Sequence, residues 1–246
     1  MVSIQPAFSF QLENKIEIGK IVLAKFDGIK PSLAAVTSGG RVLIHSPHDQ
    51  STPSAIRFLN FNRKISAITA GSLGSDTGGL MYDVLLIGTE STLSAYDVER
   101  NSDLFTTEVQ DGVNTMIIGR LGDASHSLVY VGGNCSILGY DMNGEESYWT
   151  VTSDNVCSIA IHDYNDDGKY KLLAGSEDFE LRVFKNENII KEISEADRII
   201  FIVPMNQKMF AYALANGSVG VYEGKKRLWR VKGKHQVKCS YSVVIV

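Results

Sequence analysis

The residues best placed to bind a metal ion form one short acidic segment. Asp163, Asn165 and Asp167 alternate along it in the pattern D-x-N-x-D-G. Oxygen-bearing side chains on alternate residues before a glycine are typical of the start of a calcium loop. The twelfth position is Ala174 instead of the glutamate of an EF-hand, and the ninth is Lys171, whose ammonium would repel a cation. The segment predicts a calcium site at Asp163, Asn165 and Asp167 or, as the alternative, a metal-free Asp-rich hairpin turn.

The other chemical signatures do not assemble into a catalytic site. Every Gly-Lys pair lacks the following Ser or Thr of a phosphate-binding loop, and no dinucleotide or nucleophile-elbow motif occurs. His45 and His48 have a ligand-like spacing, but Pro47 separates them and no third ligand lies nearby. No nucleophile, base and oxyanion donor come together in this pattern. We therefore expect a protein that is not an enzyme and that has no cofactor, calcium apart.

Composition indicates a cytosolic globular protein. The cysteines are Cys135, Cys157 and Cys239, an odd number that favours a reducing compartment and is interpreted as core residues. No run approaches about 18 apolar residues and the N-terminus lacks a signal peptide, so no membrane span is expected. The formal net charge of −4 disfavours a nucleic-acid partner. The one basic cluster, from Lys225 to Lys234, is interpreted as the solvent side of an edge strand, with an anionic partner site as the alternative.

The elements that must position these residues are strands in a repeating unit. Five copies share an apolar run, a turn of small residues and a second run ending in a ring. The copies are Leu33–His45, Leu85–Tyr96, Val129–Tyr140, Leu172–Phe184 and Ala211–Tyr222. Their closing rings lie 51, 44, 44 and 38 residues apart. A strand repeat of about 40 to 50 residues predicts an all-β fold, a β-propeller with one four-stranded blade per repeat.

Further strands and turns fit this unit. Apolar strands beginning near Ile16, Ile65, Val113, Val156 and Arg198 are expected to line the centre. Asn216-Gly217 predicts a tight hairpin with positive φ at both residues. Trp149 and Trp229 occur at a similar place in two fourth strands, which predicts a packing wedge between blades, with a ligand platform as the alternative. The segment Gly71–Gly79 is expected to be a flexible surface loop.

The two ends of the chain bear on closure of the ring. About five blades occupy residues 16–232, and the tail from Gln236 looks like the first strand of a sixth. Gln5–Leu12 is a candidate closing strand. We expect residues 1–246 to form one incomplete propeller domain with five blades and a partial sixth. We further expect the chain to be a fragment or truncated isoform of a larger protein.

Several segments together resemble one known family. They include residues 26–48, 101–105, 111–123, 131–141, 148–184, 212–222 and 228–234. In their order and amino-acid sequence, these segments are similar to the N-terminal propeller of the Bardet–Biedl syndrome 2 family of BBSome subunits. The resemblance runs through nearly the whole chain. Residues 235–246 depart from it as a divergent tail, and Lys171 departs from the family pattern at the acidic segment.

The resemblance implies a seven-bladed family ring, relative to which this chain is incomplete, and a non-enzymatic role. Members form part of an octameric coat-like complex that carries membrane proteins to and from the cilium. It further implies contacts with sister subunits, notably the seventh and ninth, indirect contact with membrane-protein cargo, and location in the cytoplasm, cilium, basal body and ciliary membrane. A calcium-dependent adhesion or carbohydrate-binding propeller is the alternative that the acidic segment raises. A propeller enzyme is disfavoured because the innermost strands offer mostly aliphatic residues.

Overall fold

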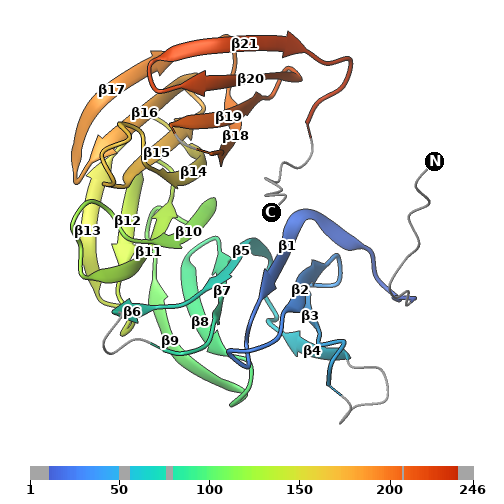
Figure 1. The fold of residues 1–246 in the computed structure, drawn as a ribbon. Coiled ribbons are helices and arrows are strands. Elements are labelled where there is room, and N and C mark those ends of the chain that lie inside the picture. The colour runs from blue at the N-terminus through green and yellow to red at the C-terminus, as the bar shows by residue number, and fades with distance from the viewer. Residues whose placement is uncertain (1–10, 50–55, 76–79, 207, 238–246) are drawn as a thin grey trace.

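The described part of the chain consists of strands and turns. The structure, a computed structural model, describes residues 11–49, 56–75, 80–206 and 208–237. The strands form five antiparallel sheets, each built from four strands in sequence order, and a short extra strand joins one of them (Figure 1). The all-β prediction with five four-stranded blades is confirmed.

The strands of each blade follow one another from the centre outward. Blade 1 contains β1 (Ile16–Ala24), β2 (Ser32–Thr37), β3 (Arg41–His45) and β4 (Ile56–Asn60). Blade 2 contains β5 (Ile65–Gly71), β7 (Val84–Thr89), β8 (Thr92–Asp97) and β9 (Ser102–Glu108). Blade 3 contains β10 (Thr115–Gly119), β11 (His126–Gly132), β12 (Ser136–Tyr140) and β13 (Glu146–Val151).

The last two blades repeat the same order. Blade 4 contains β14 (Val156–His162), β15 (Lys171–Ser176), β16 (Glu180–Lys185) and β17 (Asn188–Ser194). Blade 5 contains β18 (Ile199–Pro204), β19 (Met209–Leu214), β20 (Ser218–Glu223) and β21 (Lys226–Lys232). The extra strand β6 (Gly74–Ser75) leaves blade 2 and pairs with β11 of blade 3.

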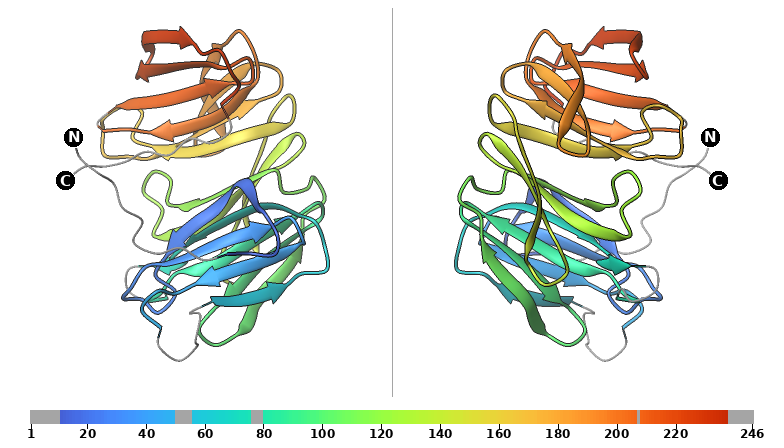
Figure 2. Two further views of the ribbon diagram at one scale, coloured as in Figure 1. Left: turned by 90° about the vertical axis from the view of Figure 1, so that its right-hand side faces the viewer. Right: turned by 90° about the vertical axis from the view of Figure 1, so that its left-hand side faces the viewer.

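The blades are arranged as an arc. The inner strands β1, β5, β10, β14 and β18 contact one another in that order around the centre (Figure 1). Blades 1 and 5 are the two ends of this arc, and the view from the open side places blade 5 above blade 1 (Figure 2). Blades 2, 3 and 4 therefore have a neighbouring blade on each face, whereas each end blade has one neighbour among the described residues.

Four apolar cores lie between successive blades, and the closing rings contribute to them. Tyr96 packs against the core shared by blades 1 and 2, and Tyr140 belongs to that of blades 2 and 3. Phe184 and Tyr222 occupy the equivalent places in the next two cores. Each ring residue therefore faces the preceding blade. Burial of this kind contributes about 1.5–3 kcal/mol for each large apolar side chain, so the ring residues hold neighbouring sheets together.

Glycines allow the blades to approach closely. Gly88, Gly132 and Gly175 hold the same register position, opposite the residue three before the closing ring. A Cβ at Gly132 would lie 2.6 Å from Val156 Cγ1, and one at Gly175 would lie 2.6 Å from Ile199 Cβ, in the first strand region of the next blade. Such distances are inside van der Waals contact, so a side chain here would push the next blade away.

The register of the fourth strands corrects the prediction about the two tryptophans. Four blades share a bulge, one unpaired residue beside the closing ring, and these residues are Leu104, Ser147, Ile190 and Leu228. The turn before the fourth strand is one residue longer in blade 3, where Tyr140 pairs with Glu146, than in blade 5, where Tyr222 pairs with Arg227. Trp149 therefore pairs with Leu138, and Trp229 pairs with Val221. The tryptophans therefore lie on opposite faces of their blades. They are 55% and 50% exposed, and the predicted wedge between blades is wrong.

The turns between second and third strands correct a second prediction. Gly217 has φ +85°, but Asn216 is absent from the residues with positive φ, so the hairpin has a single left-handed residue. Gly40 holds the same place in blade 1 with φ +72°. In blade 4 this place is taken by Phe179 with φ +69°. A phenylalanine in the left-handed region is strained because its Cβ approaches the following carbonyl oxygen.

Both chain ends fall largely outside the described residues. In the candidate closing strand Gln5–Leu12, only Gln11 and Leu12 are described, and they belong to no strand. In the tail 235–246, description stops at Val237. The partial sixth blade, the divergent tail and the single-domain boundary stay predictions.

Candidate interaction surfaces

The acidic segment forms the turn between β14 and β15 at one end of blade 4. The Asp163 carboxylate accepts backbone hydrogen bonds from Asp167 N at 3.1 Å and Gly168 N at 2.8 Å. Asp166 and Gly168 have positive φ, which closes the turn. The segment is a hairpin turn in this geometry, and the Asp163 carboxylate accepts hydrogen bonds from the backbone of its own loop. The choice between a calcium site and a metal-free turn stays a prediction.

The cation nearest the acidic turn is a lysine of the chain itself. Lys171 is 2% exposed, and its ammonium lies 2.9 and 3.1 Å from the two Asp167 oxygens and 2.7 Å from the Lys169 carbonyl. The hydrogen bond from Lys171 lowers the pKa of Asp167 to about 2, and the Asn165 side chain adds a smaller contribution. The structure therefore places Asp163, Asn165 and Asp167 on one turn and gives the Asp167 carboxylate a positive partner.

The remaining metal-type and thiol residues are dispersed. Within the described ranges, no three His, Cys, Asp or Glu side chains are grouped to hold a metal. His48 Nε2 lies 3.3 Å from Asp27 Oδ2, while His45 is buried at the end of β3. Cys135 is exposed in the turn before β12, so its interpretation as a core residue is wrong. Cys157 is half-buried in β14, and burial raises the pKa of its thiol to about 11.

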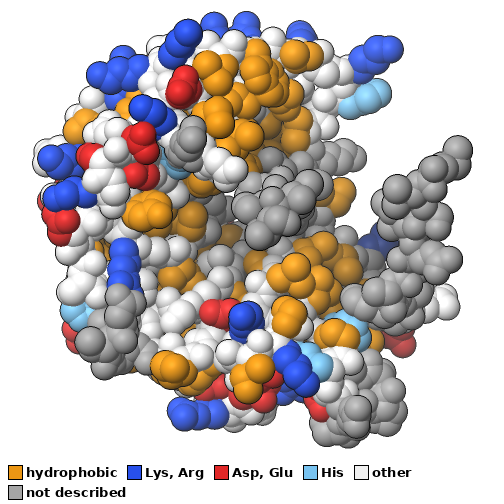
Figure 3. All heavy atoms as spheres, in the orientation of Figure 1, with side chains coloured by type: hydrophobic (Ala, Val, Ile, Leu, Met, Phe, Trp, Pro, Cys, Tyr) orange, Lys and Arg blue, Asp and Glu red, His pale blue; other side chains and the backbone are white. Residues whose placement is uncertain are grey.

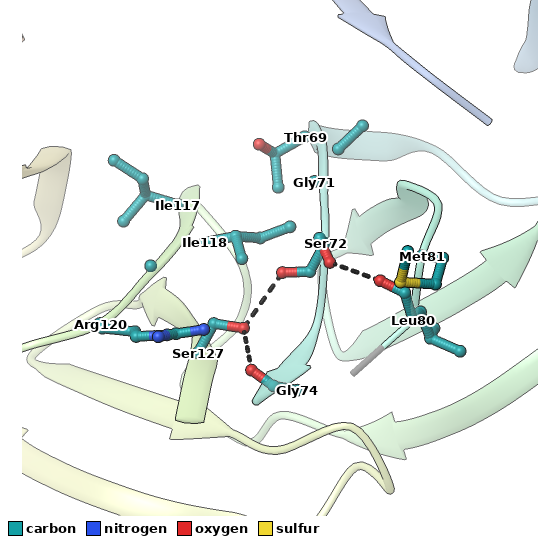
Figure 4. Close-up of a pocket in the computed structure, with 12 residues that line it drawn as sticks. Thr69, Gly71, Ser72, Gly74, Leu80, Met81, Ile117, Ile118, Arg120 and Ser127 are labelled. Atoms are coloured by element: carbon teal, nitrogen blue, oxygen red, sulfur yellow. Dashed lines mark hydrogen bonds between the residues drawn. The ribbon is translucent and has the colours of Figure 1, made fainter. Parts of the chain in front are cut away.

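A hollow of about 550 Å³ lies between blades 2 and 3. Its walls come from β5, β10 and the connection from β5 to β7, with Ile117, Ile118, Leu80 and Met81 as apolar residues (Figure 4). Arg120 is the one charged side chain among its described lining residues. The described lining residues combine serine, threonine and aliphatic side chains with one arginine, and they do not form a site for one particular ligand chemistry.

The strand that borders this hollow was not expected. Gly71–Gly79 is predicted as a flexible loop, yet Gly74–Ser75 forms β6 against β11, and residues 76–79 lie outside the described residues. Ser127 Oγ donates to the carbonyl oxygens of Ser72 at 3.1 Å and Gly74 at 3.0 Å (Figure 4). Leu73 is 1% exposed in the core of blades 2 and 3. That lone leucine among glycines and serines is the sequence signal that could have revealed the crossing.

The outer strand of blade 5 is rich in basic residues. Lys and Arg side chains gather along the top of the molecule over β21 (Figure 3). Every residue of β21 is exposed. The sequence interpretation as an edge strand is confirmed, because β21 ends the strand order of its sheet.

These features define a class of protein. Consecutive four-stranded blades, packed through apolar faces and offering exposed outer strands and turns, make a β-propeller whose chemistry lies in its surfaces. The N-terminal model of ciliary BBSome complex subunit 2 matches residues 22–119, and the middle-region model of the same subunit matches residues 158–243. The chain belongs to this family. The second match extends into the segment 235–246.

Curated relatives agree with the family models. The chain is 43% identical over 242 residues to the human protein named BBSome complex member BBS2, covering 94% of the chain. It is 37% identical over 238 residues to BBSome complex member bbs-2 of Caenorhabditis elegans, covering 96% of the chain. The chain spans about a third of the length of these relatives, 33% and 31%.

Solved structures support the fold alone, because sequence identity to them is low. The chain resembles BBS1N, solved in complex with ARL6DN and soaked with lead, at a TM-score of 0.69 and 15% identity, covering 89% of this chain and 70% of that one. It also resembles a chain of the Mitotic Checkpoint Complex at a TM-score of 0.63 and 13% identity, covering 97% and 76%. Among the described residues, no helix is long and apolar enough to cross a membrane.

Proposed function

We propose that the chain acts as the N-terminal propeller of a non-enzymatic scaffold subunit of the BBSome, in transport of membrane proteins to and from the primary cilium and in ciliogenesis. The observation that carries this proposal is the pair of family matches at residues 22–119 and 158–243, which cover most of the five-bladed arc. Sister subunits, notably the seventh and ninth, are the proposed partners. Membrane-protein cargo is contacted indirectly.

The geometry supports a scaffold. Four apolar cores fix the order and spacing of the blades, so the outer strands and turns are held as a rigid surface. A partner protein can then contact several blades at once and bury a large interface, as subunits of large assemblies do. The proposed location follows the role: cytoplasm, cilium, basal body and ciliary membrane.

Co-purification tests this function. The full-length gene product that contains the chain, tagged and expressed in ciliated cells, is expected to co-elute with other BBSome subunits on size exclusion. A matched product lacking residues 1–246 serves as the control for the contribution of the propeller. Elution of the full-length product as a free monomer would contradict the proposal.

A calcium-dependent adhesion or carbohydrate-binding propeller is the alternative, with Asp163, Asn165 and Asp167 as the ligands. The Lys171–Asp167 pair weighs against it, because calcium would have to displace a bound ammonium. Calorimetric titration of the chain with millimolar calcium separates the two functions. Heat that disappears in the Asp163→Asn variant would favour the alternative, and absence of heat would eliminate it.

A further inference from the structure

The outer strand β21 differs in charge from every other outer strand. It contains Lys226, Arg227, Arg230 and Lys232, and Lys225 and Lys234 flank it. Of the other outer strands, β4 and β17 have one basic residue each, Arg57 and Lys191, and β9 and β13 have none. The chain as a whole has a net charge of −4, so this basic surface is local.

Two of the six basic side chains serve the fold. Glu195, whose side chain is fully buried, accepts hydrogen bonds from Tyr222 OH at 2.5 Å and from Arg227 and Arg230 Nη1 at 3.3 Å. These contacts tie the end of blade 4 to the outer strand of blade 5. The two arginines are therefore explained by a buried carboxylate.

The four lysines are not explained in this way. Lys225, Lys226, Lys232 and Lys234 are exposed and have no ion pair within the described part of the chain. The acidic residue that strand pairing brings closest to these lysines is Glu223 of β20, which lies opposite Lys226. An unbalanced group of ammonium ions attracts an anionic partner and repels a basic one.

Protection of a sheet edge against aggregation does not account for this charge. Lysines on an edge strand do prevent edge-to-edge pairing. However, β9 and β13 are also outer strands at a sheet edge and have no lysine or arginine. The concentration of lysine on β21 alone therefore indicates a partner for this edge.

We propose that β21 is a docking edge for an extended acidic segment of a partner protein, which adds to blade 5 as a fifth strand. The main chain of β21 has an open side, since no described strand pairs beyond it. Strand addition supplies hydrogen bonds along that edge, and acidic side chains of the segment meet the lysines. Exposed Leu228, Trp229 and Val231 supply apolar contact between the charges. The inference does not depend on the proposed function.

Tryptophan fluorescence tests the proposal on the whole chain. The chain has two tryptophans, so Trp149→Phe leaves Trp229 as the single reporter on β21. The probe is a peptide of alternating Glu and Val, about eight residues long to match a strand. Saturable change in Trp229 emission is expected, weakening as salt rises because the attraction is screened.

Charge reversal supplies the specific variant and its control. The double variant Lys226→Glu and Lys232→Glu is expected to weaken peptide binding by about tenfold or more. The matched control, Lys64→Glu with Lys185→Glu, makes the same change in net charge at exposed sites away from β21 and should bind as the parent does. Thermal melting confirms that both variants fold.

Three results would overturn the proposal. The first is no binding of the Glu-Val peptide. The second is equal binding of a peptide in which proline replaces valine, since proline cannot supply the strand hydrogen bonds. The third is lysine-dependent binding to phosphatidylserine vesicles without peptide binding, which would assign the edge to a lipid surface. Co-purification with BBSome subunits is unaffected by any of these results, so the two proposals fail separately.

Discussion

Blade 3 and blade 5 place aromatic residues at the same register position with opposite results. Tyr148 in β13 and Trp229 in β21 each pair with the residue before the closing ring. Tyr148 is 8% exposed and donates a hydrogen bond to the Asn186 carbonyl of blade 4 at 2.7 Å, whereas Trp229 is 50% exposed. Residue type does not explain the difference. A blade packs on that face of blade 3, and no described blade packs on that face of blade 5.

The second strand does not repeat this contrast. Gly132 in blade 3 leaves room for Val156 of the next blade, while the equivalent position in blade 5 is Ala213, which is 3% exposed. The comparison therefore depends on the fourth strands, where stability should follow whether a mutated face is covered.

The largest effect is expected in a covered face. Phe184→Ala removes a fully buried ring from the core of blades 3 and 4 and should lower the free energy of unfolding by about 3–5 kcal/mol. Phe58→Ala, on a half-exposed residue of β4, is the matched control and should cost less than about 1 kcal/mol. Urea denaturation of both variants measures the difference; equal losses would contradict it.

A smaller loss is expected from filling the gap between blades. Gly132→Ala should cost about 1–3 kcal/mol, because its Cβ would meet both Val156 and Thr115. Ala124→Val, at an exposed turn residue, also adds atoms but should change the free energy of unfolding by about 1 kcal/mol or less. If this valine proved the more damaging, close packing at Gly132 would not explain its effect.

A gain is expected where a turn is strained. Phe179→Gly should raise the free energy of unfolding by about 0.5 kcal/mol, since relief of the left-handed conformation exceeds the entropy cost of glycine. Phe179→Ala keeps a Cβ at that φ and is the control that should not stabilise. Chemical denaturation of the pair checks the sign.

The smallest effect concerns the acidic turn. The pKa of Asp167 is lowered in the folded chain from 3.8 to about 2, so its pairing with Lys171 stabilises the fold above its ordinary pKa. That contribution is lost as pH falls through this window. The variant with Asp167→Asn and Lys171→Met should show a shallower decline of melting temperature over the same pH range. An unchanged decline would show that other carboxylates set the acid response.

Much of the fold can be predicted from the sequence because propeller blades repeat. The five closing rings, from His45 to Tyr222, end or nearly end the third strand of each blade, as their spacing indicates. Apolar alternation and ring spacing are local signals, and strands follow them directly.

The errors arise where one residue changes the register or where contacts are distant. The turn from Tyr140 to its partner Glu146 is one residue longer than the turn from Tyr222 to Arg227, and this difference places Trp149 and Trp229 on opposite faces. The pairing of Gly74 with Ser127 joins two blades across a long separation. Lys171 is expected to repel a cation, and its burial as the partner of Asp167 could be seen only in the folded turn.

The comparison of Tyr148 with Trp229 tests most directly whether coverage by a neighbouring blade decides stability. Both are replaced by alanine, and the free energies of unfolding are measured by urea denaturation under one set of conditions. Tyr148→Ala is expected to cost about 3–5 kcal/mol and Trp229→Ala about 1 kcal/mol or less. Equal costs at the two positions would contradict the account.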